Sequence, residues 1–255
     1  MEVIFNGISG GVMPEGDANT SFCVRMEDLS VLIDCSGSPG ASLRRAGTTL
    51  SDLDLLILTH AHTDHLYAFP SFIHGAWLEG RTKPLQIIAN RHTTEQAKRL
   101  LDVFGLIDRK GMFPIQWETT GEGRLTPVTA HSDQFVRWFT VEHSTPTIGI
   151  RLDFAGHSLV YSCDTAPCSR VREEAAGCNL LIHESNGPHE KASDLNAAGH
   201  ASAQQAGETA AAAGAGSLAL VHLPPTGREQ LLKEAQEAFE GKTFAPQIGV
   251  SYSVM

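Results

Sequence analysis

The chain has 255 residues, of which 42% are hydrophobic and 19% are charged. This composition is that of an ordinary globular protein with enough length to bury a real core, so a disordered or collagen-like chain is excluded. The 19 Lys and Arg residues against 29 Asp and Glu residues give a net charge of −10, which argues against charge-driven binding to nucleic acid or to an anionic membrane.

Short segments of β-type residues alternate with segments of helical pattern along the chain. The first half is rich in strands, and strand–helix units repeat in the second half. We therefore expect a mixed α/β protein with sheets covered by helices, in one domain that spans residues 1–255. The predicted strands are residues 3–6, 21–25, 31–34, 53–59, 85–89, 135–141, 147–154, 158–163, 179–183 and 217–222.

The helices are predicted from the signals at their ends. Pro70 and Pro167 are placed as first-turn prolines, and a glycine follows each of these segments. Capping boxes are predicted at Thr93 with Gln96 and at Ser202 with Gln205. The predicted helices are residues 70–80, 95–104, 167–177, 203–214 and 228–239.

The cysteines and the first residues indicate a cellular compartment. The five cysteines are scattered without a CxxC pair, which is no disulfide framework and fits a reducing compartment. Residues 1–5 have neither a basic start nor a long apolar stretch, so no signal peptide is expected. The longest apolar runs are too short to span a bilayer. We therefore expect a cytoplasmic protein.

Four side chains that can bind metal ions fall close together at His60, His62, Asp64 and His65, after a predicted buried strand. His60 and His62 are two positions apart, so in an extended segment they point to the same side. Asp64 and His65 lie beyond the turn and can face a second point. The spacing suits two neighbouring cations better than one, and imidazole with carboxylate is typical of zinc. Structural histidines at this density would repel one another once protonated, so we interpret the cluster as metal-binding.

Three further candidate ligands lie at the ends of predicted strands. His143 precedes one strand of a predicted hairpin and Asp164 follows the other, so the two become neighbours although 21 positions separate them. A carboxylate at that point can bridge two metal ions. His222 ends a strand as His60 nearly does, and ligands at strand ends converge along one rim.

Together these residues resemble the metallo-β-lactamase-fold hydrolases, and most closely their ribonuclease Z-like branch. The resemblance covers essentially the whole chain, including the opening glycine loop with Asn19 and Thr20. The motifs that carry it are His60-x-His62-x-Asp64-His65, Leu32-Ile33-Asp34-Cys35, His143 with Pro146 and Gly149, Tyr161-Ser162-Cys163-Asp164-Thr165, His183-Glu184, and Gly199-His200 with Ser202-Ala203.

The resemblance implies a fold and a cofactor. The fold is an αββα sandwich, in which two mixed β-sheets are flanked by helices. The cofactor is a pair of divalent metal ions, with Zn²⁺ as the default, while Mn²⁺ or Fe²⁺ fits the same ligands. Dimers are common in the branch, so a homodimer is expected. The implied ligands are His60, His62 and His143 for one ion, Asp64, His65 and His222 for the other, and Asp164 as the bridge.

The resemblance also implies catalytic groups. Asp64 would orient a hydroxide that bridges the two ions. Glu184 and His200 match the proton-transfer dyad of the branch, in which the histidine gives a proton to the leaving group. Glu184 ends a predicted strand and raises the basicity of the imidazole. His200 precedes a predicted helix N-terminus, which acts in the opposite direction, so the histidine pKa can stay near neutral.

The chain departs from the branch in one feature that narrows the range of possible substrates. Transfer-RNA-processing members carry a long arm between the positions of His143 and Asp164, and here a simple hairpin uses nearly all of that segment. With the acidic net charge, this disfavours a large RNA and favours a small phosphodiester such as a cyclic nucleotide. The alternatives are an RNA 3′-end endonuclease, a hydrolase of another ester such as an aryl sulfate or lactone, and a metal-bearing binding module without turnover.

Overall fold

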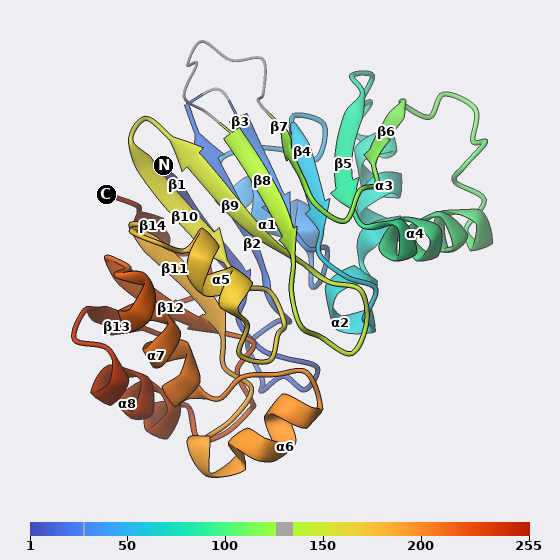
Figure 1. The fold of residues 1–255 in the computed structure, drawn as a ribbon. Coiled ribbons are helices and arrows are strands. Elements are labelled where there is room, and N and C mark those ends of the chain that lie inside the picture. Colours follow the sequence, from blue (N-terminus) through green and yellow to red (C-terminus); the bar gives the residue numbers. More distant parts are fainter. Residues whose placement is uncertain (28, 126–134) are drawn as a thin grey trace.

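Two β-sheets lie face to face with helices on their outer sides in the computed structural model, which describes residues 1–27, 29–125 and 135–255 (Figure 1). Each sheet has seven strands within these residues. The predicted αββα sandwich is therefore confirmed.

The strands follow one another across each sheet in nearly sequential order. In spatial order, the first sheet contains β14 (Ser251–Ser253), β1 (Glu2–Gly7), β2 (Ser21–Met26), β3 (Leu29–Ile33), β4 (Leu55–Leu58), β5 (Leu85–Ala89) and β6 (Ile115–Glu118). In the same order, the second sheet contains β13 (Lys242–Phe244), β12 (Ser217–Val221), β11 (Leu180–Glu184), β10 (His157–Tyr161), β9 (Ile148–Phe154), β8 (Phe135–Thr140) and β7 (Gly123–Leu125).

The strands that carry the site residues pair in parallel. The pairs from β3 to β6 in the first sheet are parallel, and so are the pairs from β10 to β13 in the second. The remaining pairs are antiparallel, including the β9–β10 hairpin. Carboxyl ends of parallel strands meet at one edge of a sheet, which is where α/β proteins place their ligands. Residues that follow β4, β10, β11 and β12 are brought to one region in this way.

The helices cover the outer faces of the sheets. The helices are α1 (Pro39–Arg45), α2 (Thr63–Leu66), α3 (Phe69–Leu78), α4 (Arg91–Val103), α5 (Ser169–Glu174), the 3₁₀ helix η1 (His189–Lys191), α6 (Ala192–Ala197), α7 (Ala203–Ala213) and α8 (Arg228–Ala238). In Figure 1, α3 and α4 lie beside the first sheet, and α7 and α8 beside the second. No helix in the described ranges is long and apolar enough to cross a membrane.

The core has one layer between the sheets and others beneath the helices. Phe22 of β2 and Tyr161 of β10 meet edge to face with ring centroids 5.0 Å apart, and both side chains are fully buried. Phe72 of α3 belongs to a buried cluster on the outer face of the first sheet. Ala206 of α7 packs with the core that includes the second sheet. Burial of these apolar side chains is what holds the strand ends, and therefore the site, in place.

Two predicted helix starts need correction. The helix expected at residue 95 begins at Arg91, because the side chain of Asn90 caps it and accepts a hydrogen bond from Thr93 N at 2.9 Å. The capping box expected at Thr93 is therefore wrong, and Asn is as good an N-cap as Ser or Asp. Pro167 precedes the N-cap Cys168 of α5 and is not in the first turn.

Other helix signals are confirmed. Pro70 lies in the first turn of α3. At α7, Ser202 accepts a hydrogen bond from the backbone of Gln205, and the Gln205 side chain accepts one from Ser202 N, so the capping box is complete. The sequence analysis missed α1, α2, η1, α6, β6, β7, β13 and β14, which are all short. Segments of three to seven residues offer too few positions for a periodic pattern to stand out.

Candidate metal centre

The seven predicted ligands come together at the carboxyl ends of the strands. Two groups consist entirely of these residues, and within each group one ligand atom from each residue lies within 4.8 Å of the others. The first group is His60, His62, His143 and Asp164, and the second is Asp64, His65 and His222. They match the two sets that the resemblance implies, and the assignment of each set to a metal ion stays a prediction. Two overlapping groups at the same distance also include Cys163, with His60 and His65, or His200, with Asp164 and His222.

The first group is built around three imidazoles. His60 Nε2 lies 3.1 Å from His62 Nδ1, which lies 3.2 Å from His143 Nε2. The two residues of the His60-x-His62 pair do point to the same side, because the chain after β4 is extended at His62. His143 approaches from the loop before β9, and its Nδ1 donates a hydrogen bond to Gly199 O at 2.7 Å, which leaves Nε2 to face the group.

The second group is joined to the first by Asp164. The Oδ2 atom of Asp164 lies 3.1 Å from His222 Nε2, 3.4 Å from His65 Nε2 and 3.6 Å from His60 Nε2. Asp64 Oδ2 lies 3.4 Å from the same His222 nitrogen and 3.7 Å from that of His65. One carboxylate therefore contacts both groups.

The protonation of the first group suits cation binding. Burial lowers the pKa of His60 well below its ordinary value, and burial also lowers the pKa of His62 and His143. Burial alone would raise the pKa of Asp164, but His222 and His65 hold it well below the ordinary value. Neutral imidazoles and an ionised carboxylate are the forms that coordinate metal ions. In the second group, burial alone would lower the pKa of His65 and His222, but Asp164 and neighbouring carboxylates raise both, that of His65 well above its ordinary value.

Several polar atoms at the centre are buried and make no hydrogen bond of normal geometry, although some lie close to a carboxylate oxygen. They are His65 Nε2, both ring nitrogens of His222 and Asp164 Oδ1. Buried polar atoms normally have hydrogen-bond partners, so such atoms need an explanation. A set of imidazole nitrogens and carboxylate oxygens that face one another at this spacing fits Zn²⁺, Mn²⁺ or Fe²⁺. The residues present therefore fit a pair of divalent cations.

The sequence analysis missed the role of Asp34, which follows β3. Its fully buried carboxylate lies 2.7 Å from His65 Nδ1 and accepts hydrogen bonds from the amide and hydroxyl of Thr59. The Thr59 hydroxyl in turn lies 3.1 Å from His60 Nδ1. One carboxylate thus orients a histidine of each group, as partners behind metal ligands commonly do. The position of Asp34 after a buried strand was the available sequence signal. Only the pairing of β3 with β4 brings Asp34 next to His65 and Thr59.

The backbone at the centre is unusual. Asp34, Cys163 and His222 have φ values of 56°, 55° and 54°. Left-handed conformations are costly for residues other than glycine and persist where the surrounding structure requires them, often at functional sites. Gly10 contributes by close approach, since a Cβ atom there would lie 2.9 Å from the His222 ring.

The predicted dyad lies against the second group. His200 Nδ1 is 3.0 Å from Glu184 Oε1, and Glu184 is fully buried at the end of β11. The same carboxylate oxygen accepts a hydrogen bond from Thr165 N at 2.7 Å. The His200 ring stacks on His222 with centroids 5.2 Å apart. Burial alone would lower the pKa of His200, but its hydrogen bond with Glu184 prevails and raises it.

The chain is similar to known proteins both in sequence and in fold. Residues 30–223 match the family described as the β-lactamase superfamily domain. Ribonuclease Z of Mycobacterium sp. (strain KMS) is 30% identical over 246 residues, which cover 88% of this chain and 85% of the relative. The metallo-β-lactamase fold protein YhfI from Bacillus subtilis has a TM-score of 0.81 at 25% identity and covers 98% of both chains. The short form of human tRNase Z has a TM-score of 0.80 at 17% identity and covers 100% of both chains.

The position of Asp164 gives a prediction about metal content. The substitution Asp164→Ala removes the one carboxylate that contacts both groups, so most of the bound metal should be lost. The measurement is metal per chain by plasma mass spectrometry, after reloading with Zn²⁺ and gel filtration. Asp102→Ala, at an exposed position on α4, is the matched control and should keep the wild-type content. Two equivalents of metal in Asp164→Ala would contradict the proposed bridge.

Proposed function

Because this chain belongs to the β-lactamase superfamily and to its ribonuclease Z-like branch, we propose that it is a dinuclear metal-dependent phosphodiesterase that hydrolyses small phosphodiesters, cyclic nucleotides among them. The observation that carries the proposal is the pair of ligand groups joined by Asp164, with the His200–Glu184 pair beside them. Membership of this family makes the chain a metal-dependent hydrolase, whereas the substrate class is our inference.

The proposed assignment of ligands follows the two groups. His60, His62 and His143 would hold one ion, Asp64, His65 and His222 the other, and Asp164 would contact both. When bound, two divalent cations supply a nucleophilic water with a pKa lowered towards roughly 7 and offset the negative charge that develops on the phosphate. Zn²⁺ is the first candidate for this donor set, with Mn²⁺ and Fe²⁺ as alternatives.

Asp64 and His200 have the proposed roles in proton handling. The side chain of Asp64 is 19% exposed, so its carboxylate can accept a hydrogen bond from the attacking water and orient it. His200 uses Nδ1 to contact Glu184, which leaves Nε2 to donate a proton to the departing oxygen. The raised pKa of His200, caused by Glu184 against the effect of burial, keeps that proton available near neutral pH.

The segment between His143 and Asp164 supports a small substrate. It contains β9 and β10, which are joined by a tight turn at Ala155 and Gly156, so no arm is inserted in this fully described stretch. The net charge of −10 adds to this argument, because the chain as a whole repels a long polyanion.

A ribonuclease Z-like endonuclease remains a second candidate. The Mycobacterium relative that is 30% identical carries that name, and the identity extends over most of both chains. The substrate would then be a precursor RNA whose 3′ end is cleaved at the same centre.

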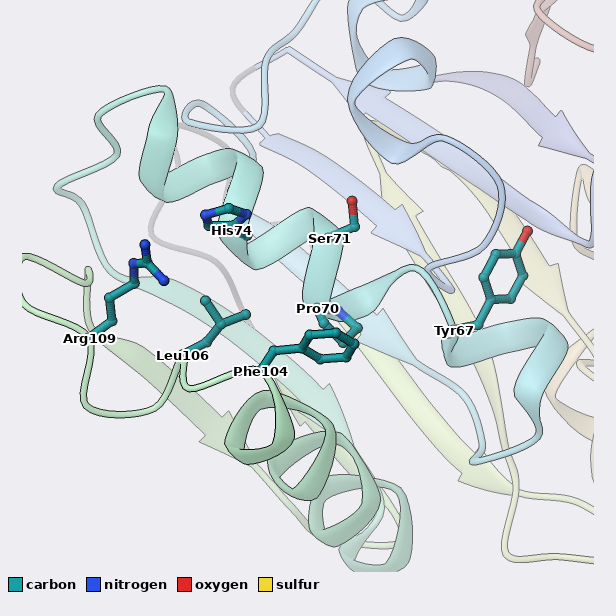
Figure 2. Close-up of a pocket in the computed structure, with 7 residues that line it drawn as sticks. All are labelled: Tyr67, Pro70, Ser71, His74, Phe104, Leu106 and Arg109. Atoms are coloured by element: carbon teal, nitrogen blue, oxygen red, sulfur yellow. The ribbon is translucent and has the colours of Figure 1, made fainter.

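We also propose that the chain forms a homodimer in the cytoplasm. Figure 2 shows a groove along α3, with Tyr67 at one end, His74 and Arg109 at the other, and Phe104 against Pro70 between them. Phe104 is 62% exposed, and the neighbouring Val103 and Ile107 are exposed as well. Clustered exposed apolar side chains mark interaction surfaces, which supports a second copy as the occupant.

The five free cysteines support a reducing compartment such as the cytoplasm.

The substrate class is tested with metal-reconstituted protein. We expect hydrolysis of bis(p-nitrophenyl) phosphate and of at least one cyclic mononucleotide, followed by absorbance and by HPLC. Precursor tRNA on a gel should stay intact at equal enzyme concentration. Cleavage of the tRNA without turnover of the small diesters would favour the second candidate and overturn the first.

The role of His200 is tested by substitution. His200→Ala should keep the metal content and lower kcat by about 10²–10⁴-fold for diesters with poor leaving groups, because a general acid contributes that much. The loss should be much smaller for a p-nitrophenolate leaving group, which needs little protonation. His189→Ala, at an exposed histidine, is the matched control. Equal losses for good and poor leaving groups would argue against proton donation.

The homodimer is tested by light scattering coupled to gel filtration. Wild type should elute with twice the mass of one chain, and Phe104→Glu should shift it towards the mass of one chain because it places a charge on an apolar contact. Val250→Glu, at an exposed apolar residue elsewhere, should leave the mass unchanged. A wild-type protein that is monomeric at tens of micromolar would exclude this interface.

A further inference from the structure

Thr165, which directly follows Asp164, joins the two ends of the β9–β10 hairpin. Its hydroxyl accepts a hydrogen bond from Glu142 N at 3.1 Å and donates one to Ala166 O at 2.7 Å. Ala166 N in turn donates a hydrogen bond to Glu142 O at 2.7 Å. Both backbone groups of Glu142 are therefore held by the segment after β10, and the predicted metal ligand His143 is the next residue.

The backbone of Thr165 also holds the predicted proton-donor pair. Thr165 N donates a hydrogen bond to Glu184 Oε1 at 2.7 Å, and His200 Nδ1 lies 3.0 Å from the same oxygen. Thr165 and Glu184 are both fully buried, and the other carboxylate oxygen, Oε2, has no hydrogen-bond partner among the described residues. A single oxygen atom thus places His200 relative to Thr165.

A second connection runs from His143 to the residue before His200. His143 Nδ1 donates a hydrogen bond to Gly199 O at 2.7 Å. Gly199 has a φ of 84°, and a Cβ atom on it would lie 2.9 Å from both His143 Nδ1 and Ser144 N. Because only glycine permits this approach, the chain before His200 fits closely against His143.

The hydrogen bonds close into a ring that contains one ligand of the first group and the proton donor. The ring consists of His143, Gly199, His200, Glu184, Thr165 and Glu142. Core packing holds His200 from one side, since the next residues, Ala201 and Ser202, are buried. The preceding elements, η1 and α6, contain no buried residue, so the ring supplies the constraint on that side.

We propose that Thr165 is a positioning residue whose hydroxyl fixes the metal ligand His143 and, through the ring, the proton donor His200. Residues 142–146 are exposed or half-buried, so without the hydroxyl the Glu142 amide would turn to water and release the loop that begins there. His143 would then move away from the other histidines of its group, and its hydrogen bond to Gly199 O would be lost.

This inference rests on the proposed metal centre and general acid and deepens both. It assigns to one hydroxyl an effect on two separate properties, the binding of metal at the first group and proton donation by His200. Groups that orient a metal ligand from behind commonly affect both affinity and activity. A side chain that serves packing alone would change only the free energy of unfolding.

The test compares Thr165→Val, which keeps the shape of the side chain without the hydroxyl, with Thr165→Ser, which keeps the hydroxyl. Competition of metal-free protein with a chromophoric chelator measures the Zn²⁺ affinity of each site. Thr165→Val should weaken one site by about 10–100-fold, because losing a group behind a metal ligand has effects of this size. Thr165→Ser should keep the wild-type affinity. Thr94→Val is the matched control, because Thr94 is buried on α4 and its hydroxyl has no hydrogen-bond partner in the described part of the chain.

Proton donation is the second readout, measured at saturating Zn²⁺ with methyl phenyl phosphate and methyl p-nitrophenyl phosphate. Thr165→Val should lose about tenfold more kcat on the phenyl diester, whose leaving group needs a proton, and Thr165→Ser should show no such difference. Wild-type Zn²⁺ affinity in Thr165→Val, or an unchanged ratio of the two diesters, overturns the inference. A failure of Thr165→Ser to restore both properties overturns it as well.

Failure of the inference is distinguishable from failure of the proposed function. If metal-loaded wild type hydrolyses neither diester, the proposed function fails, and the Zn²⁺ affinities alone decide the role of Thr165. If Thr165→Val does not fold, hydrogen exchange of wild type decides together with the affinity of Thr165→Ser. Binding of Zn²⁺ should slow exchange in residues 192–200, because His143 holds the carbonyl of Gly199. Unchanged exchange in that segment overturns the inference.

Discussion

The contact of one buried carboxylate with the imidazoles of both ligand groups is the interaction on which the centre depends. Asp164 Oδ2 lies within 3.6 Å of nitrogens from His60, His65 and His222, and the side chain is almost completely buried. A buried charge is costly unless it is paired, and its partners in this region are histidines whose own protonation burial opposes. Within the chain, Asp164 offsets this effect of burial and raises the pKa of His65 and His222, and a bound cation would take the place of the protons on these two imidazoles.

The fold brings these groups together through the parallel part of each sheet. The ends of β4, β10, β11 and β12 each deliver a polar residue to the same region, while the apolar residues of the strands form the core. The left-handed backbone at Asp34, Cys163 and His222 turns the chain sharply as each strand ends. Such conformations cost on the order of 1–3 kcal/mol each, so the packing beneath them must hold the residues in place.

Residues near one another in the sequence were easier to predict than residues joined by strand pairing. The cluster at His60 was evident because its four ligands lie between His60 and His65 in the sequence, and His143 with Asp164 followed from one hairpin. Asp34 was overlooked because its contact with His65 depends on parallel pairing of β3 with β4, which periodicity does not reveal. The start of α4 was misplaced because Thr93 was taken as its cap, whereas the hydrogen bond from Thr93 N to the Asn90 side chain shows that the helix begins after Asn90.

The distribution of charge explains how an acidic chain can act on an anionic substrate. Interactions between exposed charges are screened beyond about 8–10 Å at physiological salt, whereas groups in a buried centre interact at short range with little screening. A single phosphate that reaches the proposed ions is therefore governed by them, and the net charge of −10 matters little at that distance. Each further phosphate would lie outside the centre, where the loop before β2 presents Glu15 and apolar side chains. The centre thus acts on one phosphodiester group at short range and the net charge acts at longer range, which supports the small substrate that we propose, while Arg99 lines a groove beside Ala61 and Thr63.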